Sequence, residues 1–293
     1  MTTTPDEGTT AAPPTTALAP PAPATLVDLE RYPITDRDSA AYAAVVAAAR
    51  AELAATGAAE LSGFLSPAGL DAALADAVAV EASAHRSEGP ATAYLDWPDL
   101  DQPDGHPRRW LGQAAVGAVA WDLFPAASPI RALYEWELLR AFVEDVLDRG
   151  ALFRYADPLG GLNLATMGAG DQLQWHFDQT DFVVSLAVRD ADDGGDFEVV
   201  PRVRSAHDER YEAVGAVLDG DTSDVVTLPM TPGTLLVFEG RHSLHRVSPI
   251  NGDTTRLVAL FGYDTKPGTM SSDLLKQIRY GRTEPVAPAT TAP

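Results

Sequence analysis

LQWHFDQTDFVVSLAV, residues 173–188, places a histidine and an aspartate two positions apart in a run of strand-forming residues. Side chains alternate between the two faces of a strand, so His176 and Asp178 are expected on the same face. Burying both groups is costly unless each is hydrogen-bonded, paired or bound to a metal. Alone, this pair does not distinguish a metal site from a hydrogen-bonded core histidine.

A second stretch, GTLLVFEGRHSLHRVSPINGDTTRLVALFGY (233–263), supplies the partners that a metal site would need. It carries His242 and His245 after one apolar run, and Arg256 opens the next run. Two histidines and one carboxylate on a β-scaffold form the facial triad of non-haem Fe(II) oxygenases. His242 and His245 are three residues apart and would face opposite sides of a strand, so only one of them can join His176 and Asp178.

Composition narrows the chemistry. The chain has 293 residues, no cysteine and a formal net charge of -21. Without thiolates, any metal must be held by histidine and carboxylate, and the lack of cysteine fits a reducing, cytoplasmic location. A strongly acidic surface repels phosphate backbones and anionic lipid, so we expect a small-molecule partner and neither nucleic acid nor membrane. The sequence does not predict the oligomeric state.

The tails and the folded part differ in composition. Residues 1–25 are rich in Pro, Thr and Ala and are expected to be a disordered tail, as are residues 284–293. We expect a single domain over residues 26–283, with helices and loops over 26–150 and a strand-rich core over 151–283.

Helix signals dominate the first half. Residues 39–57 are Ala-rich and end in glycine, and Ser-Pro pairs at 66–67 and 128–129 suit helix starts. We expect a strand near residues 59–65, loops over 91–125 and one helix over 129–149. After Gly150, short runs rich in Val, Leu, Phe and Thr alternate with turn residues. Helices followed by strands indicate an α+β chain whose strands form a sandwich or barrel.

Residues 162–262 contain a His-x-Asp motif, a distal His-Arg-Val motif and an arginine after it. This pattern resembles that of the 2-oxoglutarate/Fe(II)-dependent dioxygenases. More narrowly, GDQLQWHFD, GGDFEVVP and FEGRHSLHRVSPINGDTTRLV resemble the branch of carrier-independent amino-acid halogenases and their hydroxylase relatives. The resemblance implies a double-stranded β-helix (jelly-roll) core with flanking helices. It also implies Fe(II), 2-oxoglutarate and O2 as cofactor and co-substrates.

The resemblance assigns His176, Asp178 and His245 as iron ligands and catalytic residues, and Arg256 as the residue that binds the distal carboxylate of 2-oxoglutarate. His245 is preferred over His242 because Arg246-Val247 follows it and Arg256 lies at the family's distance. Halogenases of this branch have a small residue at the carboxylate position, which leaves room for halide. An aspartate there implies hydroxylation or another oxidation.

Further candidates surround this motif. Asn163 could bind 2-oxoglutarate, and Gln174 and Glu198 could touch substrate. Arg108 and Arg109 are candidates for the substrate carboxylate, because the related branch uses an arginine upstream of the jelly roll.

The favoured function is hydroxylation of a small polar metabolite, with a free amino acid as the first candidate. Desaturation or cyclisation in natural-product biosynthesis and a non-catalytic metal-binding jelly roll stay open.

Overall fold

The computed structural model describes residues 19–286. Most of the two expected tails, residues 1–18 and 287–293, lies outside the described residues. The described part already includes a 3-10 turn at Pro23–Thr25. At the other end, the backbone N–H of Val286 donates to the Asp122 carboxylate over 2.6 Å.

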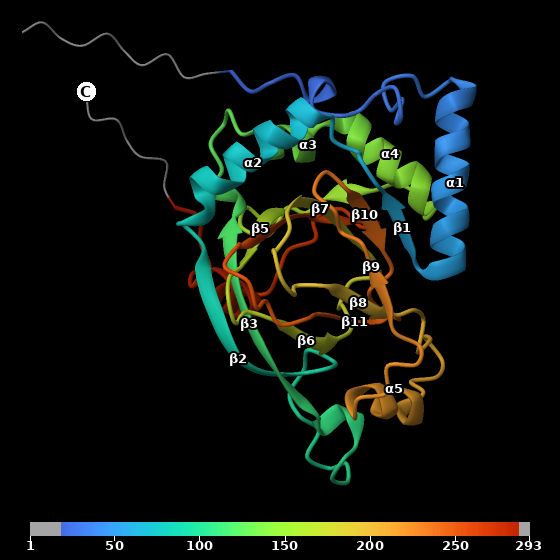
Figure 1. The fold of residues 1–293 in the computed structure, drawn as a ribbon, viewed down its shortest axis with the longest axis vertical. Helices are drawn as coiled ribbons and strands as arrows, with labels where there is room; N and C mark the ends of the chain where they lie inside the picture. Colours follow the sequence, from blue (N-terminus) through green and yellow to red (C-terminus); the bar gives the residue numbers. More distant parts are fainter. Residues whose placement is uncertain (1–18, 287–293) are drawn as a thin grey trace, which may run out of the picture.

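Two antiparallel sheets face each other and form the core (Figure 1). The large sheet has seven strands in the order β1-β10-β7-β12-β5-β3-β2, and the small sheet has four in the order β6-β11-β8-β9. The large sheet is built from β1 (Ala58–Leu61), β2 (His85–Thr92), β3 (Leu111–Ala120), β5 (Leu162–Met167), β7 (Val183–Arg189), β10 (Leu235–Phe238) and β12 (Arg256–Phe261). The small sheet is built from β6 (Leu173–His176), β8 (Phe197–Val200), β9 (Val226–Leu228) and β11 (Leu244–Val247). A short pair, β4 (Phe153–Arg154) and β13 (Tyr263–Asp264), lies apart from them.

This is the predicted α+β jelly roll, and the prediction is confirmed. The first 150 residues supply more than helical support, because β1, β2 and β3 extend the large sheet at both of its ends.

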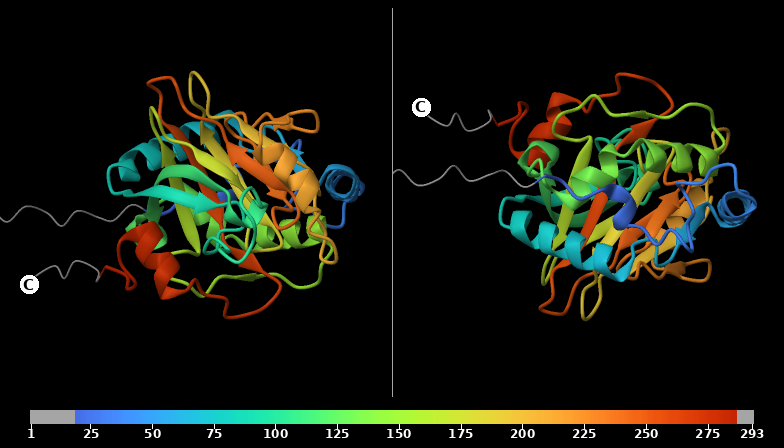
Figure 2. Two further views of the ribbon diagram at one scale, coloured as in Figure 1. Left: turned by 90° about the horizontal axis from the view of Figure 1, so that it is seen from below. Right: turned by 90° about the horizontal axis from the view of Figure 1, so that it is seen from above.

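Helices cover the outer face of the large sheet (Figures 1 and 2). They are α1 (Ala40–Thr56), α2 (Pro67–Glu81), α3 (Pro129–Glu135) and α4 (Glu137–Leu147). Their apolar side chains join Leu164, Leu257 and Phe261 of the sheet in one buried cluster. A fifth helix, α5 (Tyr211–Leu218), packs behind the small sheet, and α6 (Asp273–Tyr280) contacts β2 and β3. The inner faces of the two sheets are therefore left to line the space between them.

The helix-start signals are confirmed. The hydroxyls of Ser39, Ser66 and Ser128 each accept a hydrogen bond from a backbone N–H of the first turn of the helix that follows. Gly57 ends α1 in the left-handed conformation, which glycine adopts without strain. The expected strand before the second helix is β1.

The expectation of loops over residues 91–125 is wrong. This segment contains the ten-residue strand β3, with a 3-10 turn at Pro107–Arg109 before it and another at Trp121–Leu123 after it. The sequence hides β3 because Ala and Gly, which are depleted in strands, make up most of it. Small residues are required here: a Cβ on Gly117 would lie 2.2 Å from the Thr166 hydroxyl, and one on Gly112 would lie 2.4 Å from the Gln174 Cβ.

The single helix expected over residues 129–149 is also wrong, because the chain breaks at Trp136 into α3 and α4. The carbonyls freed at the break are satisfied from outside the helix. The guanidinium of Arg154 donates to the carbonyl oxygens of Tyr134 and Glu135 over 2.8 and 2.7 Å. No Pro or Gly marks this break, and its hydrogen-bond partner comes from β4.

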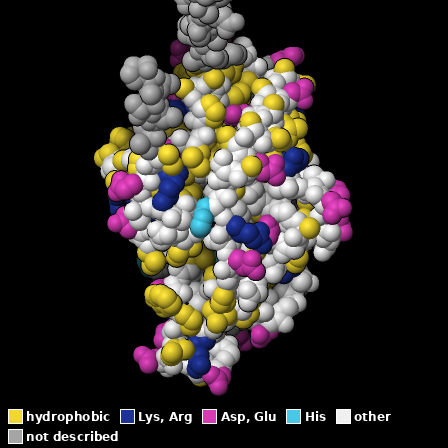
Figure 3. Space-filling model, turned by 90° about the vertical axis from the view of Figure 1, so that its left-hand side faces the viewer, with side chains coloured by type: hydrophobic (Ala, Val, Ile, Leu, Met, Phe, Trp, Pro, Cys, Tyr) yellow, Lys and Arg dark blue, Asp and Glu magenta, His cyan; other side chains and the backbone are white. Residues whose placement is uncertain are grey.

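None of the helices within residues 19–286 combines the length and apolarity that a bilayer span requires. The loop between β2 and β3 protrudes at the bottom of Figure 1. Hydrophobic side chains gather at the same end in Figure 3. Within the β2–β3 loop, Trp97 and Leu100 are 83% and 75% exposed.

Candidate active site

His176, Asp178 and His245 come together between the two sheets. Each offers one ligand atom, and these atoms lie within 4.8 Å of one another. His176 ends β6, Asp178 follows two residues later, and His245 lies in β11, where its Cα pairs with that of His176. Phe177, between the first two, points the other way and is buried behind the small sheet. The period-two argument from the sequence thus predicts the geometry correctly.

Hydrogen bonds fix the orientation of both imidazoles. The Nδ1 of His176 lies 2.7 Å from the Gln174 carbonyl oxygen, and the Nδ1 of His245 lies 2.9 Å from the Ser243 carbonyl oxygen. A carbonyl only accepts, so each Nδ1 carries the proton and each Nε2 presents a lone pair. Metal-binding histidines typically bind the metal through one ring nitrogen and donate a hydrogen bond from the other. The Nε2 of His245 lies 3.6 Å from an Asp178 carboxylate oxygen.

Electrostatics favour the same ligand states. Burial lowers the pKa of His176 to about 4, with a further contribution from His245, so the ring is neutral at pH 7. Burial works against ionisation of Asp178, but the neighbouring histidines outweigh it and its pKa lies below the usual value. Two imidazoles and one carboxylate suit a divalent first-row metal, and Fe(II) fits this donor set.

Gly240 makes room for the Asp178 carboxylate. A Cβ at position 240 would lie 1.7 Å from the Asp178 Oδ2. The backbone N–H of Asp178 donates to the Gly240 carbonyl oxygen over 3.0 Å, which brings the two segments this close. The site therefore requires glycine here, although the backbone at this position is not left-handed.

Arg256 is a buried cation with little compensation. It is 5% exposed, and its nearest carboxylate, that of Asp190, lies 4.0 Å away. Burial lowers the pKa of its guanidinium from the usual value, while Asp190 and Asp196 oppose this shift. A buried guanidinium without a close partner fits an incoming carboxylate, and the distal carboxylate of 2-oxoglutarate meets this requirement.

Asn163, Gln174 and Ser185 add buried polar groups to this space. By strand register, Asn163, Ser185 and Arg256 share the inner face of the large sheet, and Gln174 shares a face of β6 with His176. The side-chain carbonyl oxygens of Asn163 and Gln174 are buried without a hydrogen-bond partner. Such groups are costly unless a ligand satisfies them, so they fit a polar co-substrate. Ser185 was not singled out from the sequence, where it is one polar residue in an apolar strand.

The structure places Glu198 on the opposite face of the small sheet from His245. Its register partner is Arg246, and the two side chains form an ion pair. The Arg246 guanidinium also lies 4.8 Å from the centre of the Trp175 ring. Side chains alternate between the two faces of β11, so Arg246 and Glu198 point away from the group formed by His176, Asp178 and His245. This placement does not support contact between Glu198 and substrate.

Arg108 and Arg109 already have partners. The Nε of Arg108 donates to the Tyr211 hydroxyl over 2.8 Å, and its guanidinium lies 4.4 Å from the centre of the Tyr94 ring. Arg109 pairs with Asp104 over 2.8 Å. These contacts fasten the β2–β3 loop to α5, behind the small sheet, and leave neither guanidinium free to receive a substrate carboxylate.

Two residues near Asp178 have no signal in the sequence motifs. Burial raises the pKa of Tyr155 to about 12, with contributions from Asp264 and Asp178. The positive charge of Arg279, on α6, helps to lower the pKa values of His176 and Asp178. The charges of Asp178 and Arg279 thus couple the iron-binding group to residues outside the sequence motifs. His242 does not join this group and lies in the turn before β11.

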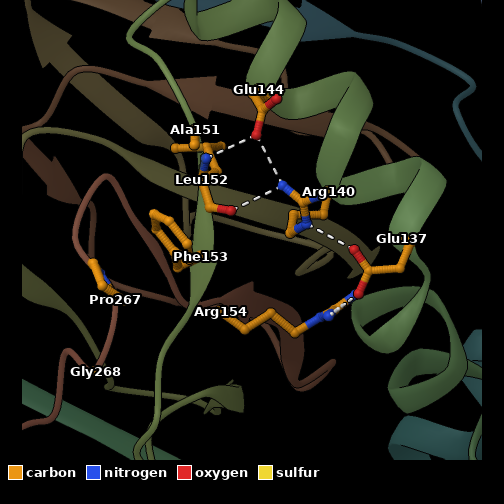
Figure 4. Close-up of a pocket in the computed structure, with 9 residues that line it drawn as sticks. All are labelled: Glu137, Arg140, Glu144, Ala151, Leu152, Phe153, Arg154, Pro267 and Gly268. Carbon is orange, nitrogen blue, oxygen red and sulfur yellow. Dashed lines mark hydrogen bonds and ion pairs between the residues drawn. The ribbon is translucent and has the colours of Figure 1, made fainter.

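A separate surface hollow of about 570 Å³ lies between α4, β4 and the segment at Pro267 (Figure 4). Its charged groups satisfy one another: Arg140 bonds Glu137 and Glu144, and Arg154 bonds Glu137. The hollow is lined by these paired groups and not by His176, Asp178 or His245, so it is separate from the candidate metal site.

Comparison with known proteins assigns the chain to a family. The halogenase D family model matches residues 115–278, and no curated protein matches the chain. AviO1 from Streptomyces viridochromogenes is 18% identical, with a TM-score of 0.52 over 77% of this chain and 97% of that one.

Two further solved structures share the fold. The epimerase SnoN from nogalamycin biosynthesis, in complex with Fe3+, alpha ketoglutarate and nogalamycin RO, is 17% identical, with a TM-score of 0.51 over 84% of this chain and 97% of that one. The non-heme alpha ketoglutarate dependent carbocyclase SnoK is 15% identical, with a TM-score of 0.51 over 82% of this chain and 92% of that one. The family model covers more than half of the chain and includes all three residues of the iron-binding group; the chain therefore belongs to the halogenase D family and is a 2-oxoglutarate/Fe(II)-dependent oxygenase.

Proposed function

We propose that this enzyme hydroxylates an unactivated C–H bond of a small polar metabolite, with a free amino acid as substrate. His176, Asp178 and His245 would hold Fe(II), and Arg256 and Asn163 would hold 2-oxoglutarate. Iron with 2-oxoglutarate and O2 supplies, when bound, an oxidant strong enough to break such a bond. A cytoplasmic location stays a prediction.

One observation carries the choice of hydroxylation within a family named for halogenation. Asp178 is present, and its carboxylate lies with the two histidines in one ligand group. Gly240 provides the space that this carboxylate needs. The Asp178 carboxylate would occupy the coordination site that a halide would need, so we assign oxygen transfer to the substrate.

The remaining residues position the reactants and exclude water. Arg256 and the unpartnered carbonyl oxygens of Asn163 and Gln174 define the polar side of the space between the sheets. Apolar residues of both sheets, including Val199, Leu236 and Phe238, fill the neighbouring part of that space. The protein contributes fixed orientation, which decides which C–H bond reacts.

The test is a two-stage assay on the purified chain. The first stage adds Fe(II) and 2-oxoglutarate without oxygen and records the charge-transfer absorption of the iron–2-oxoglutarate complex. The second stage screens amino acids for substrate-dependent succinate formation and measures the product mass. A gain of one oxygen supports hydroxylation, and a loss of two hydrogens supports desaturation instead.

The matched variant is Asp178→Gly, assayed with and without chloride. We expect loss of hydroxylation and weaker iron binding, by at least the roughly 10- to 100-fold that loss of an outer partner costs. Hydroxylation at the wild-type rate in this variant would overturn the assignment of Asp178.

A further inference from the structure

We propose that Arg279, on the C-terminal helix α6, binds the carboxylate of the substrate, which makes the substrate class small acids with a free carboxylate. This inference rests on the proposed function and deepens it by naming the recognition residue.

Helix α6 packs against the inner face of the large sheet. Tyr280 of α6 packs in one cluster with Ala118 and Ala120 of β3. Ala120 is the register partner of Asn163 in β5, and Asn163 is the register partner of Leu260 in β12. Arg256 lies four residues before Leu260 in the same strand, so it shares the face of Leu260. Residues paired in this way share one face of a sheet. α6 therefore lies on the face that carries Asn163 and Arg256, opposite to the face that α1–α4 cover.

The burial pattern along α6 shows which of its faces points inward. Residues three and four apart share a helix face, so Lys276, Arg279 and Tyr280 lie together. Lys276 and Tyr280 are 5% and 7% exposed, whereas Leu274 and Ile278 are 62% and 51% exposed. Arg279 is accordingly partly buried, on the inward side of α6.

Within residues 19–286, Arg279 makes no ion pair, although the chain has 42 acidic residues against 21 basic ones. Two other arginines without an ion pair, Arg31 and Arg210, are exposed to water. A partly buried guanidinium without an anion loses hydration that nothing replaces, and an incoming carboxylate would restore the balance with a bidentate contact.

The packing of α6 against β3 agrees with the electrostatics, since the positive charge of Arg279 helps to lower the pKa values of His176 and Asp178. Contacts hold both ends of α6 in place. At its start, the backbone N–H of Ser271 donates to Asp157 over 3.1 Å, and after its end, Arg282 pairs with Asp122 over 2.6 Å. A cation on a helix that is held at both ends is suited to fixing one end of a small substrate while another part faces His176, Asp178 and His245.

The experiment uses the full chain with Fe(II) and 2-oxoglutarate. The probes are amino acids, 2-hydroxy acids and the carboxamide of each. For the wild type we expect turnover of at least one free acid and much weaker turnover of its carboxamide. In Arg279→Gln we expect KM for the acid to rise about 10- to 100-fold, since a charge-assisted bond is lost, with KM for 2-oxoglutarate unchanged. Arg279→Lys should recover part of the loss.

Controls separate this inference from the proposed function. Arg31→Gln removes an exposed, unpaired arginine and should leave both KM values unchanged. The iron–2-oxoglutarate absorption should be intact in Arg279→Gln, which shows that the core is folded. Suppose that the absorption is intact in Arg279→Gln but turnover of the acid and of its carboxamide falls equally, or that the wild type turns over no free acid. Either result would show that Arg279 does not bind the substrate carboxylate. If the absorption is absent in the wild type, the proposed function fails, because the residues assigned to iron and 2-oxoglutarate then do not hold them.

Discussion

His245 and His176 face each other across the β6–β11 pair, with their ring centroids 4.2 Å apart. Each ring is held by a carbonyl two residues earlier in its own segment, so both Nε2 atoms converge on one point. A register shift follows immediately after His245. The relative position of the two histidines is thus set by the register of β6 and β11, and replacing either histidine should weaken metal binding.

The two candidate distal histidines can be separated by experiment. We expect His245→Ala to abolish the anaerobic iron–2-oxoglutarate absorption, because it removes a ligand, whereas His242→Ala should retain it. Titration of each variant with Fe(II) at saturating 2-oxoglutarate measures this. Equal loss in both variants would contradict the assignment of His245.

Gly240→Ala should damage the metal site without touching a ligand. The added Cβ would overlap the Asp178 carboxylate, so we expect iron affinity to fall about 10- to 100-fold. Gly168→Ala is the matched control, since the nearest atom to its Cβ would be the Thr255 hydroxyl oxygen at 4.0 Å. Iron titration by absorption or calorimetry gives the comparison. Unchanged affinity in Gly240→Ala would show that Asp178 need not occupy its present position.

Arg256→Gln should lose its response to 2-oxoglutarate. The wild type buries a guanidinium without a close partner, so binding of the dicarboxylate should stabilise it by about 2.7 kcal/mol at a concentration 100-fold above Kd. The variant should show little change in thermal unfolding at that concentration. A wild-type shift in the variant would indicate that another residue holds the distal carboxylate.

Asp157 should stabilise the chain in a pH-dependent way. Burial opposes its ionisation, but hydrogen bonds from Leu159 and Ser271 outweigh this, and its pKa lies below 3.8. Because the folded pKa is the lower one, the contribution is complete above about pH 4 and is lost as pH falls through the folded pKa.

We therefore expect Asp157→Asn to lower the free energy of unfolding by about 1–3 kcal/mol at pH 7 and by less near pH 3. Urea unfolding at the two pH values measures the difference, with the exposed Asp101→Asn as control. A cost that is the same at both pH values would show that the carboxylate charge is not responsible.

The sequence by itself determined the local features. Alternation along a strand places His176 and Asp178 on one side, and serine caps with proline mark where α2 and α3 begin. These features depend on neighbours a few residues away, so spacing and residue type are sufficient to predict them. The same reasoning does not predict β3, because Ala and Gly have low strand propensity and the strand is stabilised by pairing with β2 and β5.

Only the tertiary structure decided which charged groups surround the reaction site. Glu198 and Arg108 belong to the opposite side of the small sheet, while the last helix, which carries Arg279, packs against the inner face of the large sheet. A strand's period states which side chains share a face, but it does not state which face is the inside. That choice follows from packing between segments distant in the chain, where helices cover the outer face of the large sheet and its inner face closes around the site.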